Sequence, residues 1–159
     1  MKKISLLICL LFTVLGFQLN GQQAQNVYVE LLGNGVVYSV NYDMRLAKKD
    51  NQLGFRSGLA ILPEAGYIIL QPNYLFGAKQ HKFELGLGAT ALITTDGNTE
   101  LEQVVASGAL MYRFQRPDGH FLFRAGLSPT FVPVDENDTF SGLARVFWIW
   151  PGVSFGYKF

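Results

Sequence analysis

Hydrophobic residues alternate with small or polar residues along most of the chain, which is the period of β-strands, where successive side chains point to opposite faces. In the clearest segment, residues 148–159, Val153, Phe155, Tyr157 and Phe159 alternate with Gly152, Ser154, Gly156 and Lys158. The same pattern occupies Val36–Leu46, Leu53–Leu62, Lys82–Ile93, Gln103–Phe114 and Phe121–Phe131, and a weaker form occupies Val27–Leu32 and Tyr67–Phe76. The pattern therefore predicts eight strands.

No helical pattern competes with this interpretation. Hydrophobic residues do not recur at helical spacing over any long stretch, and glycine or proline interrupts every window of helical length. Gly33-Asn34-Gly35 predicts a tight turn after the first strand. Pro72 and Pro129 lie inside two predicted strands, and proline cannot donate a hydrogen bond to a neighbouring strand. We therefore expect an all-β fold whose strands are irregular at these two prolines.

The connections between the predicted strands are of two kinds. Residues 47–52, 77–81 and 116–120 form short connections with Lys, Arg or His, whereas two of the connections at 63–66, 94–102 and 132–147 are long and acidic. Alternate connections lie at opposite ends of an up-and-down meander. Short turns at one end and long loops at the other are typical of transmembrane barrels with strands of about 10 residues. The sequence thus predicts an antiparallel up-and-down transmembrane β-barrel.

Composition indicates which face of the strands points outward. A wall facing water needs many charged residues, but the polar face of the predicted strands is mainly Gly, Ser, Thr and Ala. Its charged residues are Glu30, Asp43, Arg45, Arg56, Glu84, Arg113, Arg124 and Lys158. Buried charges are tolerated when they are paired and hydrogen-bonded. We therefore expect the hydrophobic face to contact lipid, and we expect a lumen network in which Arg56, Arg113 and Arg124 pair with Glu30, Asp43 and Glu84.

The N-terminal segment differs from the rest of the chain. Lys2 and Lys3 precede a hydrophobic run, residues 4–17, which small and polar residues follow. This is the layout of a secretory signal peptide, and the run is shorter than the ~20 residues of a membrane-spanning helix. We assign residues 1–24 to a signal peptide cleaved between residues 21 and 25, and residues 25–159 to one barrel domain. Cys9 lies in the signal peptide, so disulfides are not expected in the mature chain.

Overall charge and composition narrow the class of protein further. The 159 residues are 49% hydrophobic and 16% charged, with a net charge of +1. This balance argues against intrinsic disorder and gives no indication of nucleic-acid binding. The length corresponds to a single domain.

The end of the chain carries a recognisable motif. Phe159 is the last residue, Tyr157 lies two positions before it, and Phe155 two before that. This arrangement resembles the C-terminal signal of outer-membrane β-barrel proteins of Gram-negative bacteria, and with the signal peptide and the glycine-rich alternation the chain is similar to their small, eight-stranded members. The resemblance implies that the barrel-assembly machinery reads Phe155, Tyr157 and Phe159 during insertion. The same three side chains are expected to contact outer-membrane lipid.

Three functional hypotheses fit this architecture. Eight strands enclose an interior that side chains can fill, so the first is a non-enzymatic barrel with a filled lumen and a structural or surface-binding role, without a cofactor. A narrow channel or conduit for small molecules is the alternative. The third, a membrane-embedded lipid-modifying enzyme, needs a nucleophile beside a base, but His81 and His120 map to the short turns while the candidate serines lie well inside strands. No feature identifies an extracellular ligand.

Overall fold

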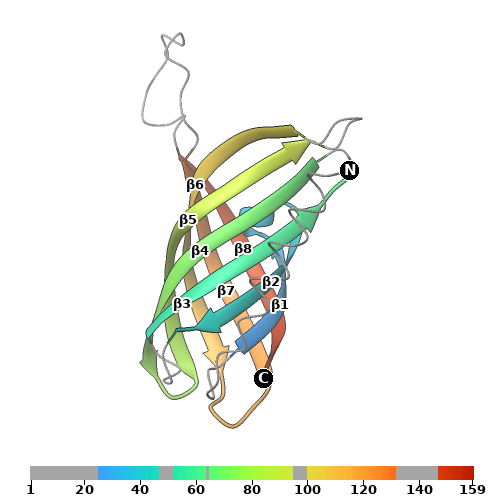
Figure 1. Ribbon diagram of the computed structural model, residues 1–159. Coiled ribbons are helices and arrows are strands. Elements are labelled where there is room, and N and C mark those ends of the chain that lie inside the picture. Colours follow the sequence, from blue (N-terminus) through green and yellow to red (C-terminus); the bar gives the residue numbers. More distant parts are fainter. Residues whose placement is uncertain (1–24, 47–51, 64, 95–99, 132–146) are drawn as a thin grey trace.

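The computed structural model describes residues 25–46, 52–63, 65–94, 100–131 and 147–159. The expected signal peptide, residues 1–24, and most of the acidic segments lie outside these ranges. Eight antiparallel strands form one closed barrel, in which sequence neighbours pair and β8 returns to β1 (Figure 1). The prediction of an eight-stranded, antiparallel, up-and-down barrel is confirmed.

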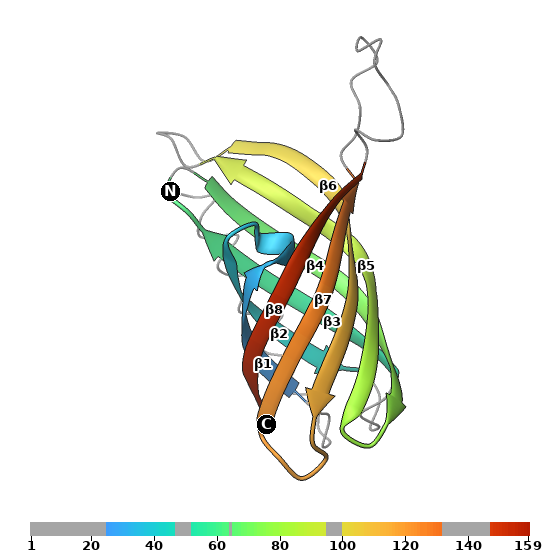
Figure 2. The same cartoon turned by 180° about the vertical axis from the view of Figure 1, so that it is seen from behind.

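The strands differ in length around the barrel. Their bounds are β1 (Gln25–Leu32), β2 (Tyr38–Arg45), β3 (Gln52–Ile61), β4 (Ala65–Ala78), β5 (His81–Thr94), β6 (Glu100–Gln115), β7 (Phe121–Phe131) and β8 (Phe147–Lys158). β1 and β2 have 8 residues each, whereas β6 has 16. The wall is therefore low over β1 and β2 and high over β4, β5 and β6, as the two opposite views show (Figure 1, Figure 2).

The first and last strands close the barrel at a regular seam. Val29 of β1 lies opposite Phe155 of β8, and the antiparallel register runs from Asn26 opposite Lys158 to Leu32 opposite Gly152. Beyond the strand, the Phe159 backbone N–H donates to the Gln25 carbonyl at 2.9 Å. Each strand therefore has a neighbour on both sides over most of its length, which removes most of the free sheet edges that promote aggregation.

The two prolines interrupt their ladders only locally. In the β4–β5 ladder no pair is formed at Pro72, and the register on either side of it, Leu70 with Ala89 and Asn73 with Gly86, is the same. The β6–β7 ladder likewise skips Pro129 and keeps its register. The irregularity expected at both positions is observed, and it leaves the alternation of inward and outward side chains intact.

The β1–β2 connection folds into the barrel. It contains the 3-10 turn η1 (Gly33–Gly35), whose three residues are all buried. Positive φ angles at Leu32 (61°), Gly33 (67°) and Val36 (65°) turn the chain inward, and the Leu32 N–H donates to the Val37 carbonyl at 2.8 Å. The tight turn predicted at Gly33-Asn34-Gly35 is present, but its inward direction was not anticipated, because sequence spacing does not specify on which side of a wall a turn packs.

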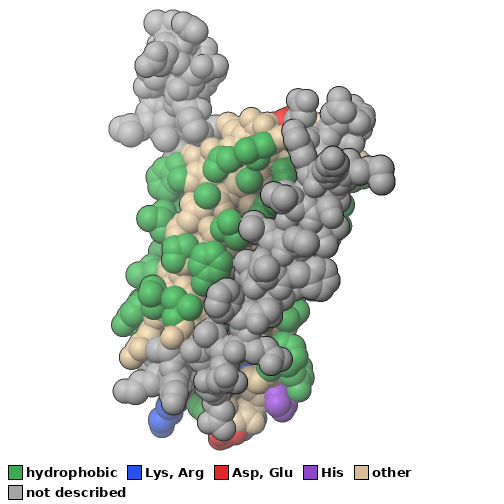
Figure 3. Space-filling model, viewed as in Figure 1, with side chains coloured by type: hydrophobic (Ala, Val, Ile, Leu, Met, Phe, Trp, Pro, Cys, Tyr) green, Lys and Arg blue, Asp and Glu red, His purple; other side chains and the backbone are tan. Residues whose placement is uncertain are grey.

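The two faces of the wall have opposite character. Large hydrophobic side chains from all eight strands are exposed, for example Val29, Val40, Leu59, Leu70, Leu85, Leu110, Leu127 and Phe155. Conversely, most charged side chains of the strands are buried: Glu30, Asp43, Arg45, Arg56, Lys82, Glu84, Arg113 and Arg124 are each at most 2% exposed. On the described surface in Figure 3, hydrophobic side chains cover the wall and charged ones lie at its ends. This arrangement is the inverse of a water-soluble protein.

Candidate functional site: the buried charge cluster

Seven inward-facing charged side chains form what we call the charge cluster: Glu30, Asp43, Arg45, Arg56, Glu84, Arg113 and Arg124. They come from six strands, β1, β2, β3, β5, β6 and β7. Alternation places every one of them on the inner face, since each is flanked along its strand by outward-facing residues. The six residues named as a network from the sequence are all brought together here.

Glu84 accepts hydrogen bonds from two arginines. Arg124 donates through Nη2 to Glu84 Oε1 at 2.5 Å and through Nε to Oε2 at 3.1 Å, and Arg113 Nη1 donates to Oε2 at 3.0 Å. The two Arg124 bonds form the bidentate fork that suits a guanidinium and a carboxylate. Because all three side chains are 0–1% exposed, little solvent screens these charges.

Asp43 makes the second junction. Arg113 Nη1 donates to Asp43 Oδ2 at 2.7 Å, so this arginine bridges Asp43 and Glu84. Arg45 donates to Asp43 Oδ1, and the Asn73 side-chain amide donates to the same oxygen at 3.0 Å. Strands on opposite sides of the barrel are thereby joined through the interior.

Glu30 makes the third junction, beside η1. Arg56 Nη2 donates to Glu30 Oε2, and Arg56 Nε donates to Asn41 Oδ1 at 2.8 Å. The Arg124 Nη1 atom lies 3.7 Å from Glu30 Oε1, so Arg124 connects Glu30 with Glu84. Three carboxylates and four arginines are therefore linked into one continuous set, with one positive charge in excess.

A buried tyrosine separates two of the arginines. Tyr28 of β1 is 1% exposed, and its ring lies 4.4 Å from Arg124 Cζ and 5.7 Å from Arg56 Cζ. A guanidinium over an aromatic face is attracted by the ring quadrupole, most strongly away from water. Tyr28 therefore stabilises two like charges that would otherwise repel each other.

Glycines on the inner face make room for these long side chains. A Cβ atom added at Gly54 would lie 2.2 Å from Arg45 Cζ, and one added at Gly156 would lie 2.3 Å from Tyr28 Cβ. At Gly54 the Arg45 guanidinium would have to move away, and at Gly156 the clash is with Tyr28 Cβ and backbone atoms, which have no such freedom. Glycines on the inner face thus leave the space into which Arg45 and Tyr28 extend.

Sequence reasoning identified six members of the charge cluster and missed the rest of its environment. Arg45 was placed on the inner face but not in the network, although its position two residues after Asp43 puts both on one face of the strand. Tyr28, Asn41 and Asn73 were not singled out, and their inner-face positions were the available signal. Lys158, counted on the same face, lies at the end of β8, where its Nζ donates to the Pro117 carbonyl at 3.0 Å.

The three C-terminal aromatic residues lie on the outside of the barrel. Phe155, Tyr157 and Phe159 are 50%, 48% and 65% exposed. Phe155 packs against Phe123 and Tyr157 against Phe159, with ring centroids 5.4 and 5.2 Å apart. They belong to a band of aromatic side chains over β4 to β8, here called the aromatic girdle, near the end where β4–β5 and β6–β7 connect; it also includes Phe76, Phe83 and Tyr112.

The two histidines lie at the same end of the barrel. His81 Nδ1 is 2.6 Å from the Tyr112 hydroxyl, and the His120 ring stacks on Tyr157 at 4.8 Å. Neither contact supplies a serine nucleophile. Within the described ranges, no group of three or more His, Cys, Asp or Glu side chains could hold a metal ion, and no helix is long and hydrophobic enough to cross a membrane.

A closed eight-stranded barrel with hydrophobic residues outside and charges inside has the architecture of the small outer-membrane β-barrels. The same fold is found in a solved structure, the N-terminal β-barrel domain of Pseudomonas aeruginosa OprF. The two superpose with a TM-score of 0.56 at 11% sequence identity, over 87% of this chain and 98% of that one. No protein-family model and no curated protein matches the sequence.

Proposed function

We propose that this protein is a non-enzymatic outer-membrane barrel whose lumen is closed by the charge cluster and whose role is structural or surface-binding. The observation that carries the proposal is the inversion of the wall: exposed hydrophobic residues on all eight strands surround a set of fully buried ion pairs. A hydrophobic exterior of this extent is stable in lipid, where the closed ladder also satisfies the backbone polar groups.

The closed lumen is supported by how the cluster spans the interior. Arg113 of β6 contacts Asp43 of β2, and Arg124 of β7 contacts Glu84 of β5, at 2.7 and 2.5 Å. The first pair crosses the barrel between opposite strands, the second joins two strands over the intervening β6, and the members of both pairs are 0–1% exposed. A water-filled pore of a porin is instead lined by solvated polar groups. The geometry favours a plug over a conduit.

Insertion by the barrel-assembly machinery is part of the same proposal. Phe155, Tyr157 and Phe159 project from the outer face of the last strand, where a second protein can reach them before the β1–β8 seam forms. After insertion the same residues contribute to the aromatic girdle, at the level where aromatic rings favour the membrane interface.

Two measurements test the proposal. The protein should be extracted from cell envelopes only with detergent, and the refolded barrel should show no sustained current in a planar bilayer. Recovery in the soluble fraction without detergent would refute the membrane placement. Steady ionic current through the unmodified protein would refute the closed lumen and favour the narrow channel.

A further inference from the structure

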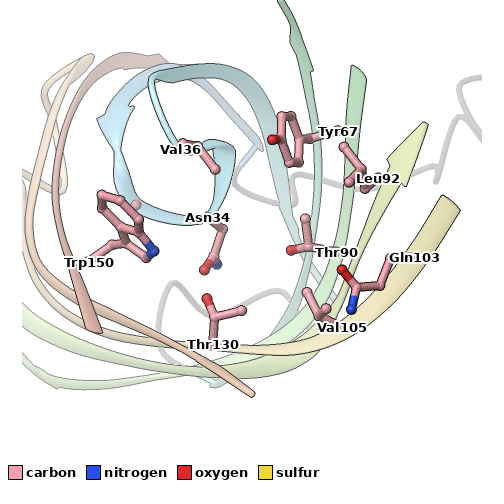
Figure 4. A pocket seen from close by; sticks show the side chains of 10 residues that line it. Asn34, Val36, Tyr67, Thr90, Leu92, Gln103, Val105, Thr130 and Trp150 are labelled. Atoms are coloured by element: carbon pink, nitrogen blue, oxygen red, sulfur yellow. The ribbon is translucent and has the colours of Figure 1, made fainter. Parts of the chain in front are cut away.

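The interior changes character along the barrel. Around the charge cluster it is ionic, but at the end that contains η1 it is lined by Tyr67, Leu92, Val105 and Trp150, with Asn34 and Thr130 among them. These side chains enclose a cavity of about 200 Å³. Figure 4 shows Asn34 and Thr130 pointing toward one another, with Trp150 beside them and Leu92 and Val105 on the far wall.

Asn34 gives this cavity an unmet hydrogen-bond acceptor. The residue is 4% exposed, and its Nδ2 donates to the Gly108 carbonyl at 3.2 Å. Its Oδ1 has no hydrogen-bond partner among the described residues. Buried polar atoms in native proteins nearly always have a partner, and an exception calls for an explanation. A hydrogen-bond donor on a bound ligand would supply the missing partner of Asn34 Oδ1.

The lining also limits the chemistry of a ligand. Among the described residues that line the cavity there is no Lys, Arg, Asp, Glu or His, so none of them compensates a charged group there. A volume of 200 Å³ corresponds to about six or seven water molecules at ~30 Å³ each. Hydrophobic walls with a few polar groups are typical of sites for small organic molecules. The fitting ligand is neutral, mostly hydrophobic, and carries one hydrogen-bond donor.

The barrel wall is low over β1 and β2, and the segment that connects these two strands contributes Gly33, Asn34 and Val36 to the cavity lining. The β1–β2 ladder ends at Leu31 and Tyr38, while residues 147–151 of β8 pair with β7 only. On the other side, Ala60 and Ile61 of β3 pair with β4 only, and the Tyr38 hydroxyl donates to the Ile61 carbonyl at 2.5 Å. Unpaired strand edges are not tolerated in hydrocarbon, so in the proposed membrane placement this part of the wall lies at the polar interface.

We propose that this cavity binds the hydroxyl-bearing end of a neutral amphiphile, whose O–H donates to Asn34 Oδ1 while its hydrocarbon part packs against Leu92, Val105 and Trp150. The amphiphile is either a free small molecule or the end of a membrane lipid. The inference deepens the surface-binding role in the proposed function. It depends on the membrane placement only for the lipid source.

The two tryptophans of the chain, Trp148 and Trp150, make binding measurable. The Trp148→Phe variant leaves Trp150 as the single fluorophore, in the cavity wall. The experiment titrates this variant in phosphatidylcholine nanodiscs with 1-hexanol, with 1-methoxypentane, which has the same size and no donor, and with hexanoate. We expect a saturable change of Trp150 emission with 1-hexanol, and at least tenfold weaker half-saturation with the other two.

Two variants on one strand provide the structural control. Val105→Phe fills the cavity, whereas Val104→Phe adds the same ring to the outer face, where Val104 is 49% exposed. Saturable binding should be lost in the first and kept in the second, with heat-dependent gel migration confirming that both are folded. Asn34→Ala should abolish the preference for 1-hexanol over 1-methoxypentane.

Brominated phosphatidylcholine distinguishes the two sources. If the brominated lipid quenches Trp150 fluorescence, and if both the Val105→Phe substitution and added 1-hexanol abolish this quenching, the occupant of the cavity is a lipid chain. Saturable 1-hexanol binding without such quenching would identify a free molecule. An unsaturable response that is equal for all three probes, or one unchanged by Val105→Phe, would overturn the inference in favour of a water-filled cavity. Ionic current through the parent barrel would refute the closed lumen of the proposed function. It would not affect the conclusion about ligand binding in the cavity, which rests on Trp150 fluorescence.

Discussion

Replacement of Glu84 by alanine should test whether the charge cluster holds the barrel together. Glu84 accepts three hydrogen bonds, two from Arg124 and one from Arg113. Its removal leaves both guanidinium groups buried with fewer partners. The matched control is Glu102→Ala, which deletes an exposed carboxylate from β6, outside the cluster.

The size of the effect follows from what remains. Hydrogen bonds to charged groups contribute about 1.5–3 kcal/mol each, so three lost bonds set an upper limit of roughly 5–9 kcal/mol. Arg113 keeps Asp43 and Gln115, at 2.7 and 2.8 Å, and Arg124 keeps Ser154 at 3.2 Å. Breaking a buried ion pair typically costs about 3–5 kcal/mol, and because these partners remain we expect the lower half of that range.

Charge counting predicts a second, independent effect. The cluster has four arginines and three carboxylates, and Glu84→Ala leaves two carboxylates. If water enters the vacated space, the leak should select anions, since the excess positive charge of the cluster rises from one to two and the buried Lys82, opposite Arg113 in the sheet, adds to it. Glu84→Gln keeps the shape and should give the same selectivity with a smaller conductance.

The assays are urea unfolding in detergent micelles, followed by gel migration, and planar-bilayer conductance with unequal salt across the membrane. We expect Glu84→Ala to lower the free energy of unfolding by about 3–4 kcal/mol and to conduct, and Glu102→Ala to match the parent within about 0.5 kcal/mol. If both variants match the parent in both assays, the cluster contributes nothing to closure and its ion pairs are incidental. A cation-selective leak would show that the residual charge is not what governs entry.

Three further substitutions probe the surroundings of the cluster. Gly156→Ala should lower the free energy of unfolding by about 1–3 kcal/mol, because the added Cβ overlaps Tyr28. The control Gly66→Ala, whose added Cβ has no atom closer than 3.8 Å, should match the parent in the same unfolding assay. Equal effects of the two variants would show that the backbone at Gly156 shifts to accept the Cβ. Tyr28→Phe should be at least as stable as the parent, because the Tyr28 hydroxyl has no partner among the described residues, and Tyr28→Leu should lose about 2 kcal/mol of cation–π attraction; similar stabilities would exclude the ring as a contributor. Deletion of Phe159, whose ring is 65% exposed, should lower the outer-membrane level several-fold while changing the stability of the refolded barrel by less than about 1 kcal/mol; an unchanged level on quantitative immunoblotting would contradict the assembly role.

Sequence pattern predicted the fold because one physical rule, alternation, applies at almost every position. A strand has only two faces, so the placement of Arg56 or Glu84 on the inner one follows once the hydrophobic face is assigned outward. The actual partners do not follow from alternation. They depend on strand stagger and on side-chain reach across the interior, which bring Arg113 to Asp43 and Glu84 at once.

The cavity beside η1 was beyond prediction for a related reason. Gly33-Asn34-Gly35 indicates a tight turn, yet its burial depends on positive φ angles at Leu32 and Val36, residues that seldom adopt them. The sequence shows that β1 is short. That this leaves a low wall beside the cavity depends on how far β4, β5 and β6 extend on the opposite side.

The seam between β1 and β8 gives the charge cluster a role in folding as well as in stability. A shift of one residue at this seam would turn Glu30 from the interior to the outer face of the barrel, because strand faces alternate with a period of two. Glu30 would then lose Arg56 and Arg124 and lie as an isolated charge among the hydrophobic side chains of the outer face. A wrong register between β1 and β8 is therefore unfavourable, so the ion pairs favour the correct register when the first and last strands pair.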